Sequence, residues 1–388
     1  MTPRGEEILN YLKARQKDLI DLTKRLVSIE SPSLETHTHG PALAILADAL
    51  ADQGYAVRRL GKSEDGEHLY ARPINPKKYQ AFQILIGHID TVWPVGTLDN
   101  MPIENESGQL RGPGVYDMKA GLVQMVFAIT ALRDLGLTPN VTPLVFVNSD
   151  EEIGSHGSRH YIERFARHAD RAFVLEPSLG EHGHIKTARK GVGRYTIRAK
   201  GKAAHAGLDP EAGASAILEL SHQIQHLFAL NDPDAGISVN VGTIDGGLRP
   251  NVIAPESSAV IDVRVPTREA ATRVHDAIHA LKPATPGVQL EISGAIGRPP
   301  MEQGEAGAAV WRVAKSAAVE LDLELEHGMA GGGSDGNTTS QYTGTLDGLG
   351  AVGDGAHAHH EFIFVDKLAE RSALLALLLL APPMSNNA

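Results

Sequence analysis

The chain has 388 residues and a formal net charge of −11, because 36 Lys and Arg stand against 47 Asp and Glu. It contains 18 His but no Cys, which excludes disulfides, thiolate nucleophiles and zinc or iron–sulfur sites ligated by cysteine. The length predicts two or three domains, and the acidic balance argues against broad nucleic-acid binding.

The sequence predicts neither a secretory leader nor a membrane anchor. Residues 1–10 lack the basic region and apolar run of a signal peptide. The most apolar run near the end, 374–381, is too short to cross a bilayer, and Pro382 and Pro383 are expected to end it as a helix. We therefore expect a cytoplasmic protein that binds neither a membrane nor nucleic acid.

The first part of the chain alternates helices with buried strands. Apolar residues recur at helical spacing over 8–26 and predict one helix, and a second is expected over 41–52, before Gly54. Continuous apolar runs alternate with a further helix over 118–135, which is typical of an α/β sheet covered on both faces. The strands predicted from these runs are 82–86, 144–147 and 172–175.

After about Thr187 the pattern changes to strands in which apolar and polar residues alternate. Two helices, over 211–230 and 267–281, separate these strands, and the order β-α-β-β-α-β matches a ferredoxin-like unit. From about Met301 the earlier pattern returns. The sequence therefore predicts an α/β domain formed by residues 1–187 and 301–388, with a ferredoxin-like α+β domain inserted at 188–300.

Polar residues stand where the apolar strands stop. His88 and Asp90 follow the first strand, Asp-Glu-Glu at 150–152 follows the second, and Glu176 follows the third. Ligands of open α/β sheets bind beyond the carboxyl ends of the strands, so these side chains are expected to meet there. Asp117, just before a predicted helix, adds a carboxylate.

A further histidine, His357, precedes an apolar run near the end of the chain. Histidines with several carboxylates suit a pair of divalent ions such as zinc, and one bridging carboxylate would hold them ~3.5–4 Å apart. Asp90 is placed to accept the other imidazole N–H of His88. Each residue alone is more typical of a helix cap or a solvated loop than of a metal site, but the joint pattern favours a metal site.

Seven short segments carry a family resemblance, and they occur in the family's order over nearly the whole chain. They are 87–92 (Gly-His-Ile-Asp-Thr-Val), 112–121, 150–155 (Asp-Glu-Glu-Ile-Gly-Ser), 175–177 (Leu-Glu-Pro), 201–207, 331–335 (Gly-Gly-Gly-Ser-Asp) and 357–361. Together they resemble the di-zinc exopeptidases and deacylases, which include glutamate carboxypeptidase, aminoacylase, acetylornithine deacetylase and succinyl-diaminopimelate desuccinylase. Glutamate carboxypeptidase is the most similar of these types.

The resemblance implies a fold and a set of metal ligands. The α/β/α domain would be zinc-exopeptidase-like and catalytic, and the inserted domain would serve as a lid and for dimerisation. His88 and Glu176 would bind one zinc, Glu152 and His357 would bind the other, and Asp117 would bridge both. The peptide bond after Asp117 is expected to be cis.

The resemblance also implies the catalytic groups. Glu151 would take a proton from a water activated by the two zinc ions and pass it to the leaving nitrogen, while Asp90 orients His88. His205, on the inserted domain, would reach the site of the partner subunit and stabilise the oxyanion, which makes a homodimer part of the catalyst.

Three histidines crowd the loop that carries the last ligand. The family pattern places its ligand four residues before a glutamate, and this selects His357 against Glu361. His359 and His360 are then expected to be solvated or to lie around the site without binding the metals.

A substrate carboxylate requires a cation, and Arg offers the best bidentate match. Arg264 ends a predicted strand and resembles the family arginine that binds a substrate carboxylate, and Asn251 resembles an asparagine that contacts the carbonyl or carboxylate. A surface salt bridge is the alternative role for a basic residue. The further candidates for substrate binding are the backbone N–H groups of Gly332, Gly333 and Ser334 and the side chains of Arg298 and Lys190.

We therefore predict a hydrolase that releases a C-terminal amino acid from a small peptidyl or N-acyl amino acid. It would use two Zn²⁺ per chain, with Co²⁺ or Mn²⁺ as possible substitutes, and would form a homodimer through the inserted domain. An N-acyl amino acid deacylase or a dipeptidase remains an alternative. A non-catalytic binding protein on the same scaffold is a third, against which Glu151 argues, because binding alone needs no base beside the ligand Glu152.

Overall fold

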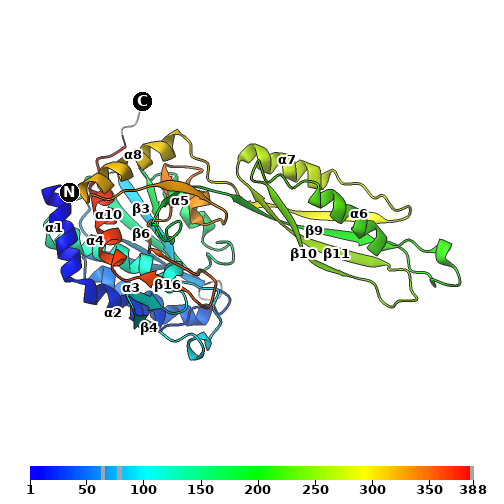
Figure 1. Ribbon diagram of the computed structural model, residues 1–388, viewed down its shortest axis with the longest axis horizontal. Coiled ribbons are helices and arrows are strands. Elements are labelled where there is room, and N and C mark those ends of the chain that lie inside the picture. Colours follow the sequence, from blue (N-terminus) through cyan, green and yellow to red (C-terminus); the bar gives the residue numbers. More distant parts are fainter. Residues whose placement is uncertain (63–65, 77–80, 385–388) are drawn as a thin grey trace. The chain divides into compact units, whose positions relative to one another are not determined.

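The computed structural model describes residues 1–62, 66–76 and 81–384, and the chain divides into two units. Unit 1 comprises Met1–Ala188, Gln303–Ala330 and Ser334–Ala388, and unit 2 comprises Arg189–Glu302 and Gly331–Gly333 (Figure 1). The chain divides after residues 188 and 302, within two residues of the boundaries that we predicted after 187 and 300. The short segment Gly331–Gly333, which we expected in the first domain, groups with unit 2.

A six-stranded sheet forms the centre of unit 1, in the order β1-β2-β6-β3-β7-β14. Strands β6, β3, β7 and β14 run parallel, while β1 and β2 are antiparallel to their neighbours. The strands are β1 (Tyr55–Lys62), β2 (Gly66–Pro73), β3 (Phe82–His88), β6 (Thr142–Asn148), β7 (Ala172–Val174) and β14 (Thr345–Leu346).

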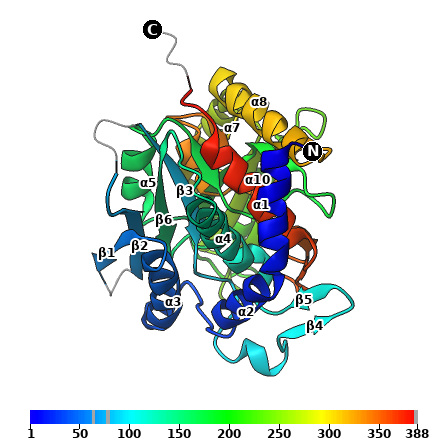
Figure 2. The same ribbon diagram turned by 90° about the vertical axis from the view of Figure 1, so that its left-hand side faces the viewer.

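Helices cover both faces of this sheet (Figure 2). Leu85 and Val145 pack into the main core with α1, α4 and α10, whereas Ile84 and Phe146 face a smaller cluster with α5. Burial on both faces explains why the strands are apolar at consecutive positions. The helices of unit 1 are α1 (Pro3–Ala14), α2 (Gln16–Val27), α3 (His39–Ala51), α4 (Ala120–Asp134), α5 (Arg159–Ala166), α8 (Glu305–Glu320), α9 (Asp335–Thr339) and α10 (Lys367–Leu380).

The helices of unit 1 differ from the prediction at α5, which we did not predict, and near the N-terminus. The single helix expected over 8–26 is two helices, α1 and α2, because the backbone leaves helical geometry at Arg15, with φ −106° and ψ 17°. Helix α10 ends at Leu380, ahead of Pro382, as predicted. The segment Val115–Asp134 is long and apolar enough to cross a membrane, but 94% of its most apolar window is buried inside the protein, as in a core helix.

Smaller elements complete unit 1. A second sheet has the order β15-β16-β5-β4, and β13 pairs with β8. These elements are β4 (Glu104–Glu106), β5 (Gln109–Arg111), β8 (Ile185–Arg189), β13 (His327–Ala330), β15 (Gly353–Asp354) and β16 (Phe362–Phe364), with single turns η1 (Thr36–Thr38), η2 (Thr97–Asp99) and η3 (Val115–Lys119).

Unit 2 is a four-stranded antiparallel sheet in the order β10-β11-β9-β12. Its sequence order is β-α-β-β-α-β, and α6 and α7 pack on the face that carries Tyr195 and Ile261. The predicted fold class, an α/β domain with an inserted ferredoxin-like α+β domain, is therefore confirmed. The elements are β9 (Gly191–Lys200), η4 (Pro210–Ala212), α6 (Ala216–Phe228), β10 (Ser238–Gly246), β11 (Glu256–Val265), α7 (Arg268–His279) and β12 (Gln289–Arg298).

Candidate metal centre

His88 is the last residue of β3 and is 1% exposed. Its Nδ1 lies 2.9 Å from the backbone oxygen of Asp90. Its Nε2 lies 3.1 Å from Asp117 Oδ1 and 3.5 Å from Glu176 Oε1. Because Nδ1 donates to the backbone oxygen of Asp90, Nε2 is the ring nitrogen that faces the two carboxylates, where it would bind a metal ion.

Electrostatics at His88 favour a positive charge between these carboxylates. Burial lowers the pKa of His88, but hydrogen bonds with Asp117, Asp90 and Glu176 outweigh it and raise the pKa well above its usual value. The carboxylates that stabilise a proton on His88 would stabilise a divalent cation at the same position.

Asp117 points its two carboxylate oxygens toward two different histidines. Oδ1 lies 3.1 Å from His88 Nε2, and Oδ2 lies 3.6 Å from His357 Nε2. His357 Nε2 in turn lies 3.1 Å from Glu152 Oε2. Burial raises the pKa of Asp117, but the two histidines outweigh it and lower the pKa far below its usual range. The peptide bond Asp117–Met118 is cis, as predicted.

The donor set fits a pair of divalent cations. Within the described residues, Glu152 Oε1 is buried and has no hydrogen-bond partner, and burial, with Asp117 nearby, raises the pKa of Glu152 to about 7. An unpaired buried carboxylate oxygen is costly, and a cation would satisfy it. Ligand atoms of His88, Asp117 and Glu152 all lie within 4.8 Å of one another, as do those of His88, Glu151 and Glu176. Imidazole and carboxylate ligands suit Zn²⁺ and similar ions.

Asp90 is fully buried and ties the ring of His88 to the loop after β6. Its Oδ1 accepts the backbone N–H of Glu151 at 3.2 Å, and its Oδ2 accepts that of Glu152 at 3.1 Å. The Ser33 hydroxyl donates to Oδ2 at 2.7 Å. Burial raises the pKa of Asp90, but His88 and these donors outweigh it and lower the pKa. The carboxylate of Asp90 therefore positions the backbone of residues 151–152. It also lies 3.4 Å from His88 Nδ1, whose nearer partner is the backbone oxygen of Asp90 rather than the carboxylate that we expected.

The loop that carries Glu151 and Glu152 has further carboxylate anchors that the sequence analysis did not assign. Asp150 accepts the backbone N–H groups of Gly157 and Ser158 at 2.7 and 3.1 Å. Asp335, which we treated only as part of a glycine-rich segment, accepts Asn148 Nδ2 at 2.8 Å. These bonds immobilise the segment that follows β6.

Glu361 is the main positioning residue that sequence reasoning missed, because we used it only to count back to His357. It is 1% exposed and accepts the backbone N–H groups of Gly114, Tyr116 and Asp117 at 2.9, 2.8 and 3.0 Å. Its Oε2 also accepts the Trp93 indole N–H at 2.9 Å. The available signal was a Glu directly before the short buried strand β16.

The other two histidines of this loop lie outside the cluster. The rings of His359 and Trp93 have centroids 5.3 Å apart, and His360 Nε2 lies 4.0 Å from Asp354 Oδ2. Ser334 does not present its backbone N–H to a ligand as we expected. This N–H is buried and donates to Asn337 Oδ1 at 2.8 Å, as part of the capping box that begins α9.

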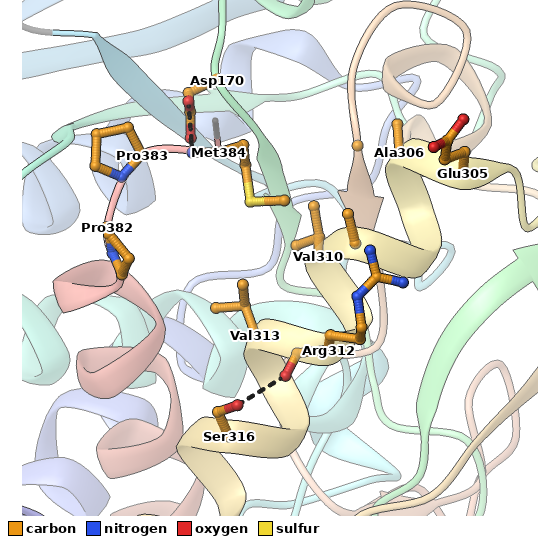
Figure 3. Close-up of a pocket in the computed structure, with 12 residues that line it drawn as sticks. Asp170, Glu305, Ala306, Val310, Arg312, Val313, Ser316, Pro382, Pro383 and Met384 are labelled. Atoms are coloured by element: carbon orange, nitrogen blue, oxygen red, sulfur yellow. Dashed lines mark hydrogen bonds between the residues drawn. The ribbon is translucent and has the colours of Figure 1, made fainter. Parts of the chain in front are cut away.

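A separate cavity of about 730 Å³ lies between α8 and the segment after α10 (Figure 3). Val310 and Val313 form one wall, and Met384, whose N–H donates to the Asp170 carboxylate at 3.0 Å, forms another. None of its lining residues is one of the predicted site residues, so this cavity is not part of the candidate metal centre.

Unit 2 holds most of the remaining predicted residues, in two groups. His205 and Asn251 lie together and are exposed: the chain forms a bridge between His205 and Val252, and Ala206 N–H donates to Asn251 O at 3.0 Å. His205 Nδ1 accepts two backbone N–H groups, each at 3.1 Å.

The basic residues form the second group, at the other end of strand β9. Arg264 and Arg298 both pair with Val192, near the start of the strand, and Lys190 comes just before it. Arg264 makes a bidentate ion pair with Asp262, at 2.8 and 3.1 Å. The ten residues of β9 separate the two groups by about 30 Å, so unit 2 does not bring His205 and Arg264 together. The carbonyls of Gly332 and Gly333 accept Arg189 at 3.1 and 3.2 Å.

Comparison with known proteins places this site in a family. The model of peptidase family M20/M25/M40 matches residues 84–381, which include every candidate ligand. The chain belongs to peptidase family M20/M25/M40. The match agrees with the predicted resemblance, and the chain is therefore a metal-dependent hydrolase of this family.

Individual relatives share both sequence and fold with this M20 peptidase family chain. It is 27% identical over 378 residues to carboxypeptidase G2 from Pseudomonas sp. strain RS-16, covering 94% of this chain and 89% of the relative. The structure of the aminopeptidase PepT from Bacillus cereus matches with a TM-score of 0.78 at 23% identity, over 94% of this chain and 98% of that one. The YxeP protein from Bacillus subtilis, described as a dinuclear metal-binding peptidase of the M20 family, matches with a TM-score of 0.69 at 16% identity, over 95% and 98% of the two chains.

Proposed function

We propose that this protein is a di-zinc exopeptidase that hydrolyses a peptidyl or N-acyl amino acid and releases the C-terminal amino acid. The observation that carries the proposal is Asp117, whose two oxygens face two histidine–carboxylate pairs, with Glu151 beside the first. The 27% identity to carboxypeptidase G2 over 94% of the chain supports the carboxypeptidase direction.

The chain's own residues would divide the work of amide hydrolysis. His88 and Glu176 would hold one ion, Glu152 and His357 the other, and Asp117 both. When bound, the two ions would lower the pKa of a water and polarise the substrate carbonyl.

Glu151 would accept the proton of the attacking water and then donate it to the leaving nitrogen. It is 8% exposed, and its carboxylate oxygen lies within 4.8 Å of ligand atoms of His88 and Glu176. Asp90 would keep the His88 ring in the tautomer whose Nε2 lone pair faces the ions.

A homodimer through unit 2 is part of the proposal. His205 is exposed on the loop after β9, where it would be available to the site of a second subunit and would stabilise the oxyanion there. Exposed apolar side chains lie in the neighbouring segments, with Leu208 82% and Leu248 71% exposed, as is typical of a surface that another chain covers.

For the substrate carboxylate we propose Arg264, with Arg298, Lys190 and the backbone N–H groups of Gly332 and Gly333 as further contacts from the same chain. Asn251 lies beside His205, at the other end of β9, and would contact the substrate from the second subunit. Arg264 would exchange its present partner, Asp262, for the substrate carboxylate or share its guanidinium between the two.

The test is amino-acid release by the purified protein supplied with Zn²⁺. The panel contains N-blocked dipeptides, free dipeptides and N-acyl amino acids, each with a free and an amidated C-terminus. We expect turnover of the free-carboxylate member of a pair and little of the amide. Equal turnover of both members would contradict the carboxylate requirement, and no turnover of any member would overturn the proposal that the protein releases a C-terminal amino acid.

The same panel separates the two alternatives. Turnover of N-acyl amino acids alone indicates a deacylase, and turnover of unblocked dipeptides alone indicates a dipeptidase. Release from N-blocked dipeptides is the result that the carboxypeptidase proposal requires.

A further inference from the structure

Two loops beside the candidate metal centre contain no Asp, Glu, Lys or Arg, in a chain of which these four residue types make up 21%. They are residues 91–98 (Thr-Val-Trp-Pro-Val-Gly-Thr-Leu) and 355–360 (Gly-Ala-His-Ala-His-His). Val92 is 42% and Val95 is 53% exposed on the first loop. Exposed apolar residues that gather beside a reactive centre, rather than standing singly, are typical of a binding surface.

Aromatic rings and one further apolar residue extend this surface. Trp93 is half-buried and packs against the ring of His359, with centroids 5.3 Å apart. Leu34 is 82% exposed and follows Ser33, whose backbone N–H donates to Thr91 O at 3.2 Å. We call this set the apolar rim; it consists of Leu34, Val92, Trp93, Val95 and His359.

The rim is held rigid by two carboxylates. Glu361 Oε2 accepts the Trp93 indole N–H at 2.9 Å, and Glu30 accepts the backbone N–H groups of Gly96 and Leu98, both at 2.8 Å. A loop fixed in this way loses little conformational entropy when a ligand binds to it, so exposed apolar area on it converts efficiently into affinity.

The rim and the metal centre share one anchor. The other oxygen of Glu361, Oε1, accepts the backbone N–H of Asp117 at 3.0 Å, so the same carboxylate positions the Trp93 ring and the bridging aspartate. His359 lies two residues after His357 in the second loop. The Trp93 ring therefore lies near the backbone of Asp117, within reach of the acyl group of a substrate whose amide is bound there.

We propose that the apolar rim is a subsite for the acyl half of the substrate and that it selects an uncharged, apolar acyl group. The inference rests on the proposed function. The amino acid that leaves carries a carboxylate and needs a cation such as Arg, whereas the two loops that form most of the rim contain neither Lys nor Arg. A charged acyl group placed there would lose hydration without gaining a partner.

The test compares acyl groups on one amino acid, the one released best by the wild type. N-succinyl and N-4-methylpentanoyl have nearly the same shape and differ in charge, and N-benzoyl and N-acetyl differ in apolar area. For the wild type we expect kcat/KM to be at least about tenfold higher for 4-methylpentanoyl than for succinyl, since burying an uncompensated polar group in a protein costs ~1–3 kcal/mol.

Three variants identify the rim as the cause. W93A should lower the benzoyl-to-acetyl ratio of kcat/KM by about tenfold, whereas W93F, which keeps a ring but lacks the N–H, should largely retain it. V95A should lower the same ratio to a smaller extent. Val319, 70% exposed on α8, provides the matched control, and V319A should leave the ratio unchanged.

The outcomes separate this inference from the proposed function. If W93A lowers turnover of all acyl groups equally, or if the wild type prefers succinyl, the rim is not an acyl subsite. If no substrate is hydrolysed, the rim can still be tested by calorimetry. The affinity of the N-benzoyl amino acid is then measured for zinc-loaded wild type and for zinc-loaded W93A. Weaker binding by W93A supports the rim while hydrolysis fails, and equal or absent binding overturns it.

Discussion

In unit 1, the candidate residues His88, Asp90 and Glu176 are buried and lie around one point, whereas in unit 2 His205 is exposed and Arg264 keeps 32% of its side chain exposed. The difference follows from strand direction. The parallel strands β3, β6 and β7 end at the same edge of a sheet, so the residues that follow them meet. The antiparallel strands of unit 2 end alternately at opposite edges, and their terminal residues form two separate groups.

Burial also sets how much each residue matters. Several carboxylates packed together out of water repel one another, and cations or hydrogen-bond donors must compensate them. In unit 1 a single change therefore disturbs a coupled cluster, while in unit 2 an exposed side chain is solvated and its neighbours adjust. The following experiments test that contrast, from the largest expected effect to the smallest.

Replacing Glu151 by Gln should have the largest effect. E151Q keeps the size of the side chain but removes the proton acceptor, and we expect kcat to fall by about 10²–10⁴-fold. Metal content, measured by elemental analysis, should stay at the wild-type value. Full activity in E151Q would mean that another group is the base.

Gly121 tests the packing that brings Glu176 to the cluster. A Cβ at Gly121, in α4, would lie 2.2 Å from the backbone oxygen of Leu175, the residue before Glu176. We expect G121A to lower the free energy of unfolding by about 1–3 kcal/mol and to weaken metal binding. Gly40, in α3, is the control, because a Cβ there has nothing within 4 Å, and G40A should be neutral or stabilising. Equal denaturation midpoints for the two variants would contradict this view of the packing.

Glu361 tests the support around the bridging aspartate. E361Q replaces an acceptor of four hydrogen bonds with an amide whose NH₂ group cannot accept. Loss of such outer contacts typically weakens metal binding by about 10–100-fold, which chelator competition will measure. Glu106, exposed on β4 in the same small sheet as β16, gives a matched variant, E106Q, for which affinity should not change.

The candidate ligands could be predicted from sequence because their signal is local. His88 and Glu176 stand at or just after the end of a buried parallel strand, and this position alone places each side chain at the carboxyl edge of the sheet. Glu361 could not be found in this way, since its partners at 114–117 are more than 240 residues away and are backbone N–H groups, which no side-chain pattern marks. Ser334 was misjudged for a related reason, because its N–H is taken by Asn337 in a helix cap.

The fold was predictable where periodicity was unambiguous. Alternation identified the strands of unit 2, and continuous apolar runs identified β3, β6 and β7. The break at Arg15 between α1 and α2 could not be predicted, because apolar residues recur at helical spacing on both sides of it and neither Gly nor Pro marks it. Local pattern thus located elements and their ends, while contacts over long sequence separation decided which polar groups support the site.

Glu219, in α6 of unit 2, should have the smallest effect on the metal centre, and it sharpens the contrast from the other side. It is fully buried and accepts the backbone N–H of Thr285 at 2.6 Å, that of Ala284 at 3.0 Å, and Gln223 Nε2 at 2.5 Å. Burial raises the pKa of Glu219, but these donors outweigh it and lower the pKa below its usual value. The carboxylate therefore stabilises unit 2 above about pH 4.3, and this stabilisation is lost as the pH falls through the lowered pKa.

We expect E219Q to destabilise the protein at pH 7 by about 1–3 kcal/mol, because its NH₂ group would face donors. The loss should shrink as the pH is lowered, since the wild-type carboxyl is then protonated too. Denaturation midpoints of both proteins at pH 7 and at successively lower pH check the trend, with E211Q, at an exposed position in η4 of unit 2, as the control. A gap between wild type and E219Q that stays constant with pH would show that the charge of Glu219 is not what stabilises unit 2. If the difference in stability between wild type and E219Q disappears at low pH while the metal content is unaffected, the carboxylate of Glu219 serves only the fold of unit 2. The carboxylates of unit 1, in contrast, serve the metal centre.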